Sequence, residues 1–110
     1  MEDGLYSLDF SAHDGSSGSG VAVFNGTRVL GGDSTYFYEG TVSPRAGNTF
    51  EANVVARRHQ ATGVSIFGNL DVLNLRLSGE ALGPRFTLNG HVEELPQARI
   101  TVVCRKLAEL

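Results

Sequence analysis

Short stretches of alternating hydrophobic and polar residues run along most of the chain. In the clearest of them, Leu73, Leu75 and Leu77 alternate with polar side chains. Period-two alternation is typical of a β-strand that buries one face and exposes the other. About eight such segments are predicted strands, and they cover residues 4–11, 21–24, 27–30, 36–42, 49–58, 71–78, 85–92 and 99–107.

Turn-forming residues separate the predicted strands. Asn25-Gly26 lies between two apolar runs and predicts a tight hairpin with a type I′ turn, which needs positive φ twice. Asn89-Gly90 is placed inside a strand instead, because the apolar alternation continues through it. The next turn is predicted at residues 94–97, whose proline cannot donate to a central ladder. Two further turns are predicted at residues 44–48 and 79–84.

Two segments lack a strand pattern. Residues 13–20 are rich in Gly and Ser and are predicted to form a mobile loop. Residues 59–70 fit neither the helical nor the strand period. We expect there a loop with one helical turn, anchored by Val64, Ile66 or Phe67.

A Gly-Gly-Asp motif, Gly31-Gly32-Asp33, lies between two predicted strands. Paired glycines can take positive φ, and Asp33 can accept hydrogen bonds from the backbone that follows it. A phosphate-binding loop would need a helix N-terminus after the glycines. Because an aromatic strand pattern begins at Tyr36, the motif is interpreted as a structural turn.

Composition limits the class of protein. The 110 residues suit one domain, here residues 1–110, and 41% hydrophobic with 19% charged residues is ordinary for a globular protein. The formal net charge of −3 argues against general nucleic-acid binding. Cys104 is the one cysteine, so no internal disulfide can form. We expect no signal peptide and no membrane span, which favours the cytoplasm.

About eight sequential antiparallel strands predict an all-β fold, a small lipocalin-like barrel, because closure removes exposed sheet edges. A sandwich is the competing architecture. A barrel of this size is filled by side chains or holds one small ligand, and we expect a mostly filled interior. Outward apolar residues such as Leu5, Val55 and Val103 are candidates for a dimer seam. The inward-facing candidates for lining a cavity are Tyr6, Leu8, Phe10, Leu73, Leu75, Leu77, Phe86 and Leu88.

No constellation of catalytic or metal-binding residues stands out. His13, His59 and His91 lie on different segments, whereas a metal site needs clustered ligands. Cys104 falls on an apolar strand face, where a cysteine behaves as a small hydrophobe. We therefore expect no catalytic, metal or cofactor site. Arg57-Arg58-His59 and Arg105-Lys106 are interpreted as solvated rim residues, since single-strand binding also needs exposed aromatics.

Several short motifs, in order, resemble the GrlR-type proteins, small negative regulators of bacterial type III secretion. The resemblance is clearest over the first 43 residues and continues in Phe86-Thr87-Leu88 before His91-Val92. The motifs in the first part are Gly4-Leu5-Tyr6-Ser7, Gly20-Val21-Ala22-Val23 with Asn25-Gly26, Gly31-Gly32-Asp33 and Tyr38-Glu39-Gly40.

The resemblance implies a lipocalin-like barrel, commonly dimeric and not catalytic, that binds a transcriptional activator of secretion genes and holds it inactive. The best-known member carries an acidic Glu-Asp-Glu-Asp motif on the loop that matches residues 43–48. Here that loop has one arginine, Arg45, and no acid, so the acidic contact cannot be carried over.

Three functions remain in view. The first is a non-enzymatic regulatory protein that binds a protein partner and forms a homodimer. The second is a carrier or sensor of a small apolar ligand. The third is a small barrel enzyme using His91 or Asp33.

Overall fold

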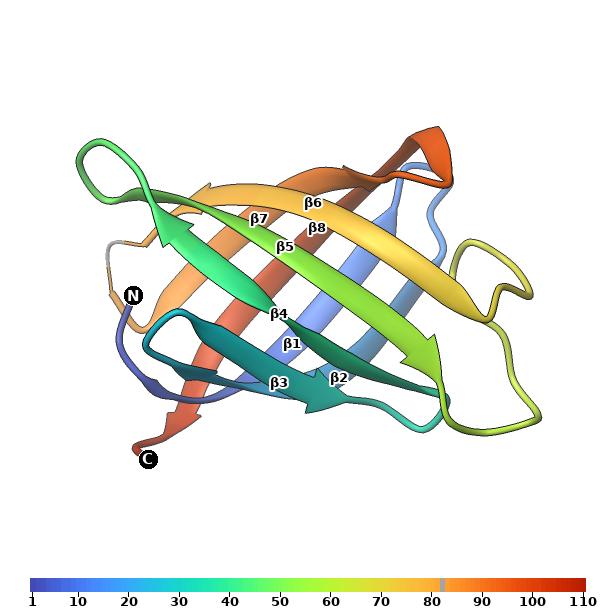
Figure 1. Cartoon of the computed structure of the whole chain (residues 1–110), viewed down its shortest axis with the longest axis horizontal. Coiled ribbons are helices and arrows are strands. Elements are labelled where there is room, and N and C mark those ends of the chain that lie inside the picture. The colour runs from blue at the N-terminus through green and yellow to red at the C-terminus, as the bar shows by residue number, and fades with distance from the viewer. Residues whose placement is uncertain (82) are drawn as a thin grey trace.

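The computed structural model of the chain describes residues 1–81 and 83–110, and these form an all-β fold. Eight antiparallel strands follow one another in sequence order, and β8 returns to pair with β1, so the sheet closes into a barrel (Figure 1). The predicted fold is confirmed. The strands are β1 (Gly4–Ala12), β2 (Ser17–Asn25), β3 (Arg28–Gly32), β4 (Tyr36–Pro44), β5 (Thr49–Arg58), β6 (Val72–Glu80), β7 (Arg85–Val92) and β8 (Leu95–Ala108).

The predicted inward faces are the buried ones. In β5, Phe50, Ala52, Val54 and Ala56 are buried while the residues between them are mostly exposed. In β8 the inward residues include Cys104, which pairs across the barrel seam with Leu8 of β1. Alternation along each strand therefore lines the barrel interior with apolar side chains on all sides. None of the described residues belongs to a helix that could cross a membrane.

The prediction of a loop over residues 13–20 was wrong for its second half. Strand β2 begins at Ser17, and Gly18 and Gly20 pair with Phe10 and Leu8 of β1. A Cβ atom at Gly18 would lie 2.5 Å from the Phe10 ring. Glycine is thus used in this strand to make room for a neighbouring side chain, which its sequence pattern does not reveal.

The hairpin at Asn25-Gly26 is confirmed, but its turn is shifted by one residue. Asn25 pairs with Arg28, so the two loop residues are Gly26 and Thr27. Gly26 has a φ of +62°, and no described non-glycine residue has a positive φ. A positive φ at the first loop position alone is the pattern of a type II′ turn, not type I′.

The last strand begins earlier than predicted. β8 starts at Leu95, and the turn before it is formed by Glu93 and Glu94. Val92 pairs with Leu95 and His91 with Arg99, so the register shifts and Pro96 lies in the resulting irregularity. Proline has no backbone N–H to donate to the ladder, and it is tolerated at such a bulge.

Residues 59–71 join β5 to β6, and no helical turn is found there, contrary to the prediction. The segment is a loop with one isolated bridge between Ser65 and Gly68. Ile66 and Phe67 pack against the core, whereas Val64 is 63% exposed. The turn predicted at residues 79–84 was wrong for its first two residues, because β6 extends to Glu80; residue 82 lies outside the described residues.

The two ends of the barrel differ in how they are filled. Both termini lie at one end, at the left of Figure 1. The rings of Tyr6, Phe24, Phe50 and Phe86 fill it, with centroids 5.1 to 5.8 Å apart. Edge-to-face aromatic packing of this kind closes what we call the aromatic end. The β3–β4 turn and the β5–β6 loop lie at the opposite end, the loop end, at the right of Figure 1.

Candidate functional site

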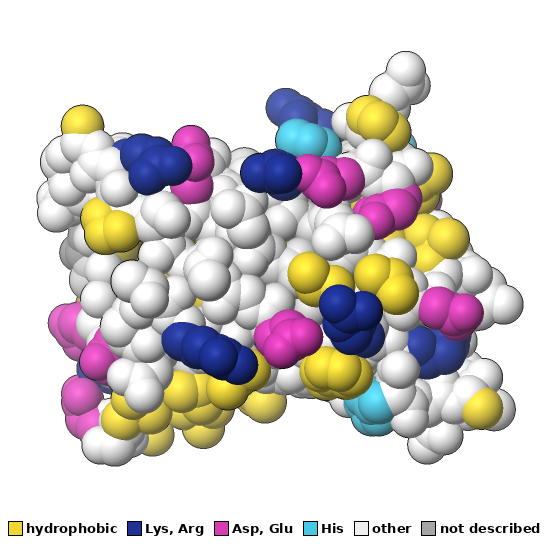
Figure 2. Space-filling view, in the orientation of Figure 1, with side chains coloured by type: hydrophobic (Ala, Val, Ile, Leu, Met, Phe, Trp, Pro, Cys, Tyr) yellow, Lys and Arg dark blue, Asp and Glu magenta, His cyan; other side chains and the backbone are white. Residues whose placement is uncertain are grey.

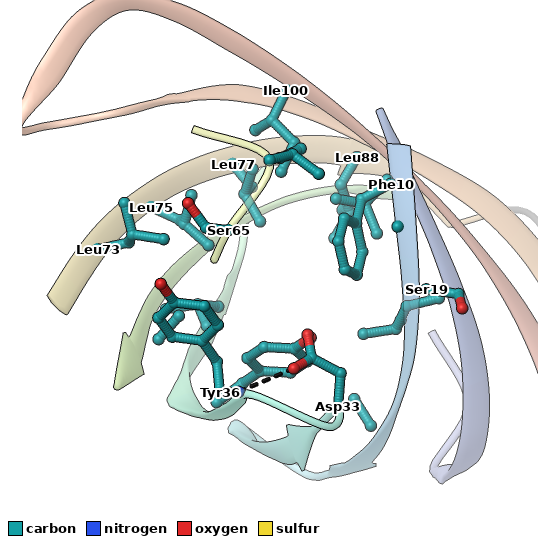
Figure 3. Close-up of a pocket in the computed structure, with 18 of the residues that line it drawn as sticks. Phe10, Ser19, Asp33, Tyr36, Ser65, Leu73, Leu75, Leu77, Leu88 and Ile100 are labelled. Carbon is teal, nitrogen blue, oxygen red and sulfur yellow. Dashed lines mark hydrogen bonds between the residues drawn. The ribbon is translucent and has the colours of Figure 1, made fainter. Parts of the chain in front are cut away.

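An apolar cavity of about 370 Å³ opens at the loop end of the barrel (Figure 3). Its wall is formed by side chains from all eight strands, among them Ala22, Val54, Leu77 and Leu88. The barrel interior is therefore only partly filled. Aromatic rings fill the aromatic end, and the cavity occupies the loop end. A cavity of a few hundred Å³ with an apolar lining is the usual form of a small-molecule site.

Six of the eight inward residues predicted from the sequence line this cavity. They are Leu8, Phe10, Leu73, Leu75, Leu77 and Leu88. Tyr6 and Phe86 lie at the aromatic end instead, with their ring centroids 5.4 Å apart. The alternation pattern could not separate the two groups, because it shows which side chains point inward but not how deep each lies along the barrel axis.

The Gly-Gly-Asp motif forms part of the cavity mouth. The N–H groups of Thr35 and Tyr36 each donate to Asp33 Oδ1 over 2.8 Å, which closes the turn between β3 and β4. The Tyr38 hydroxyl donates to Asp33 Oδ2. The chain turns after the two glycines, at residues 33–35, and Asp33 also presents its carboxylate to the cavity.

The two glycines of the motif have another physical role than the one predicted. Gly31 and Gly32 lie at the end of β3, and neither has a φ in the left-handed range. A Cβ at Gly31 would instead lie 2.7 Å from the Cα of Ala22 on β2. The motif requires glycine because β2 and β3 approach closely there, not because the chain reverses.

Tyr38 stays a neutral hydrogen-bond donor at the mouth. Burial raises the pKa of its hydroxyl far above the ordinary value, and the neighbouring Asp33 carboxylate raises it further. Gly20 of β2 makes space for this hydroxyl, since a Cβ there would lie 2.9 Å from it. No pattern in the sequence indicates this arrangement, which joins β2, β4 and the turn between β3 and β4.

The β5–β6 loop covers one side of the mouth. Ile66 and Phe67 line the cavity from this loop. Arg58 holds the loop in place, since its guanidinium donates to the Gly63 carbonyl over 2.7 Å and to Asp71 over 2.9 Å. The same group lies 5.3 Å from the centre of the Tyr36 ring. Arg58 is therefore a structural residue of the mouth and not part of an exposed basic patch.

The other basic residues differ in exposure: Arg57 is a solvated rim residue as predicted, whereas the Lys106 side chain is only 9% exposed, contrary to the prediction. Arg57 lies 3.6 Å from Glu39. Lys106, on β8, pairs with Glu2 and Glu109 over 2.8 Å each. These contacts hold the pKa of Glu2 below and that of Lys106 above their ordinary values.

The histidines and the cysteine lie apart. His91 borders a polar groove on the outer face, with Arg76 and Arg99, while Asp33 lines the interior cavity. Burial raises the pKa of the Cys104 thiol to about 12. Within residues 1–81 and 83–110, no three His, Cys, Asp or Glu side chains are grouped so that they could hold a metal ion.

Hydrophobic side chains also gather on the outside of the barrel, over β3 and the strands beside it (Figure 2). Val21, Leu30 and Phe37 are 45%, 46% and 40% exposed. Leu30 pairs with Val23 on β2, and Phe37 pairs with Gly32, which pairs with Val21. These four apolar side chains, Val21, Val23, Leu30 and Phe37, form one surface, which we call the β2–β4 face.

The fold and this site define a class, the small closed antiparallel barrels with an apolar cavity at one end. The family model described as "T3SS negative regulator, GrlR" matches residues 1–110, the whole chain. The chain therefore belongs to the GrlR family, and membership implies a negative regulator of type III secretion. None of the curated proteins compared with the chain matches it.

Proposed function

We propose that the protein regulates type III secretion without catalysis, by binding a transcriptional activator of secretion genes and holding it inactive. The observation that carries this proposal is the family match over all 110 residues. A protein that acts on a transcriptional activator works in the cytoplasm.

The activator contact differs from the acidic contact of the family's best-known member. The loop of residues 45–48 lies at the aromatic end, and its Arg45 pairs with Glu51 over 2.8 Å. A loop with one arginine and no acidic residue cannot make the contacts of an acidic cluster. We therefore assign the activator contact to the outer surface of the barrel and not to this loop.

The test is an affinity capture from a bacterial host that carries a type III secretion system. The tagged protein should recover a transcriptional activator, and the purified activator should lose binding to its promoter DNA when the protein is added. Arg45→Ala should capture the activator as well as the original protein does. Recovery of the tagged protein alone would contradict the proposal.

The β2–β4 face supports a homodimer. Apolar side chains exposed together on a strand face indicate a contact surface. In an isologous dimer the same face of two copies would pack together and remove Leu30 and Phe37 from water. The half-buried Leu5 and Val55 lie beside this face, since Leu5 pairs with Val23 and Val55 with Glu39.

A second candidate function, the binding of a small apolar ligand, is favoured by the cavity of about 370 Å³. An apolar dye should bind once per barrel. Leu75→Trp should abolish this binding, because the larger side chain fills the cavity. Leu107→Trp is the matched control, since Leu107 is 50% exposed outside the barrel and should leave binding unchanged. Dye binding that survives Leu75→Trp would place the dye elsewhere.

A further inference from the structure

The cavity is polar at its mouth and apolar in its depth. The Tyr38 hydroxyl lies at the mouth, where it donates to Asp33, and Ser65 lines the mouth from the β5–β6 loop. Figure 3 shows Leu77, Leu88 and Ile100 on the wall across from Asp33. This division suits an amphiphile, a molecule with a polar head and an apolar tail.

Asp33 is the single charged residue among the described residues that line the cavity. It takes part in none of the ion pairs formed by the described part of the chain. His59 approaches it over 2.9 Å, but the contact is to the Asp33 backbone carbonyl. A half-buried carboxylate beside an apolar space is normally compensated by a positive charge, and the ion pairs among residues 1–81 and 83–110 supply none here.

The carboxylate can also accept one more hydrogen bond. The two oxygens of an ionised carboxylate offer about four acceptor positions. Two backbone N–H groups and the Tyr38 hydroxyl occupy three of them, and all three donors are neutral. Since Tyr38 keeps its proton, it adds no second negative charge that the ligand would have to balance.

The volume limits the size of the ligand. At about 30 Å³ per water-sized atom, a cavity of about 370 Å³ holds about a dozen non-hydrogen atoms. Each buried CH₂ group adds to affinity, so the apolar part of a ligand of this size contributes to binding even without a polar contact at the mouth.

We propose that the cavity binds a cationic amphiphile, a protonated amine on an apolar chain or ring of about a dozen non-hydrogen atoms. The ammonium group pairs with Asp33 at the mouth, and the tail lies against Leu77, Leu88 and Ile100. This inference rests on the second candidate function, because it specifies the ligand of that same cavity.

The experiment compares three probes of equal chain length by isothermal titration: decylamine, decanol and decanoate. Decylamine should bind once per barrel and about tenfold more tightly than decanol, because a hydrogen bond between charged groups is stronger than a neutral one. Decanoate should bind most weakly, because its charge is repelled by Asp33.

Two variants test the source of the preference. Asp33→Asn should remove the preference for decylamine while decanol still binds. Asp9→Asn is the matched control, because Asp9 is exposed on β1 and outside the cavity, and the preference should persist. A preference that survives Asp33→Asn would overturn the inference.

The outcomes separate this inference from the function on which it rests. If decanol binds as tightly as decylamine, or decanoate binds most tightly, the cavity is a ligand site but its cationic selectivity is wrong. If none of the three probes binds, the second candidate function itself fails. The comparison of probes on the unaltered protein decides both points, even if Asp33→Asn disturbs the turn.

Discussion

At the scale of single residues, glycines decide how closely neighbouring strands approach. Gly18 makes room for the Phe10 ring, and Gly20 for the Tyr38 hydroxyl. Gly31 lets the backbone of β3 pass close to Ala22. None of these three glycines has a φ in the left-handed range. They shape the cavity mouth because they lack a side chain, and not because they adopt a special backbone conformation.

Replacing Gly31 with alanine should lower the free energy of unfolding by about 2 kcal/mol, because the added Cβ overpacks against β2. Gly47→Ala is the control. Gly47 has a φ of +66° and no atom within 4 Å of an added Cβ, so it should lose only about 1 kcal/mol from backbone strain. Denaturant unfolding measures both, and equal losses would argue against close packing at Gly31.

The Cys104 thiol should make stability fall in alkali. It ionises at its ordinary value of 9.0 in the unfolded chain and at about 12 in the barrel, so the unfolded state binds fewer protons between these values. The free energy of unfolding should therefore decrease by up to about 1.4 kcal/mol per pH unit from pH 9 upward. Below pH 9 this contribution is fully present.

Cys104→Val should remove this slope between pH 9 and 10. Tyr38, whose pKa is also raised, adds a decrease only from its ordinary value of 10.0 upward, so the two groups can be distinguished. Denaturant midpoints measured across this range provide the test. Parallel curves for the variant and the original protein would contradict the assignment.

At the scale of elements, the β5–β6 loop is the one long connection among the described residues, and Arg58 organises it. Besides Asp71 and Gly63, its guanidinium contacts Asn69 Oδ1 over 2.5 Å. The Arg58 side chain is 12% exposed, so these contacts are sheltered from water. Ile66 and Phe67 are thereby held over the cavity.

Arg58→Ala should cost about 2 kcal/mol of unfolding free energy, since several hydrogen bonds of a charged group are lost together. Hydrogen exchange should quicken in residues 59–71 and stay unchanged in β8. The matched control, Arg57→Ala, should change stability by less than about 0.5 kcal/mol, because that side chain is exposed. Unchanged exchange in the loop after Arg58→Ala would refute the role given to this residue.

At the scale of the whole molecule, closure leaves the outer surface as the place for protein contacts. The pairing of β1 with β8 removes the sheet edges, so addition of a strand from a partner is not available. Contacts must then use side chains on the outer faces of the strands. The β2–β4 face is the apolar surface that meets this requirement.

Phe37→Glu should weaken the proposed homodimer, because a charge would be buried in an apolar interface. Sedimentation equilibrium should show the original protein as a dimer and the variant shifted toward monomer. Val64→Glu is the control, since Val64 is 63% exposed on the loop and lies outside the β2–β4 face. A monomeric original protein would contradict the dimer, whereas activator capture by monomeric Phe37→Glu would assign this face to dimerisation alone.

Some features of this protein are local properties of the chain. The alternation around Leu73, Leu75 and Leu77, for example, identified both the strand and its buried face, because the side-chain period of a strand depends on neighbouring residues alone. The number of strands and the tight turns at Gly26 and Gly47 follow from the same short-range chemistry.

Tertiary structure decided the rest. Whether an inward side chain lines the cavity, as Leu88 does, or closes the other end, as Phe86 does, depends on its depth along an axis that exists only once β8 meets β1. The pairing of Asp33 with Tyr38 depends on Gly20, which makes room for the hydroxyl from β2, a strand that does not pair with β4. Such contacts have no period along the chain, so only the closed barrel could bring a carboxylate to the mouth of an apolar cavity.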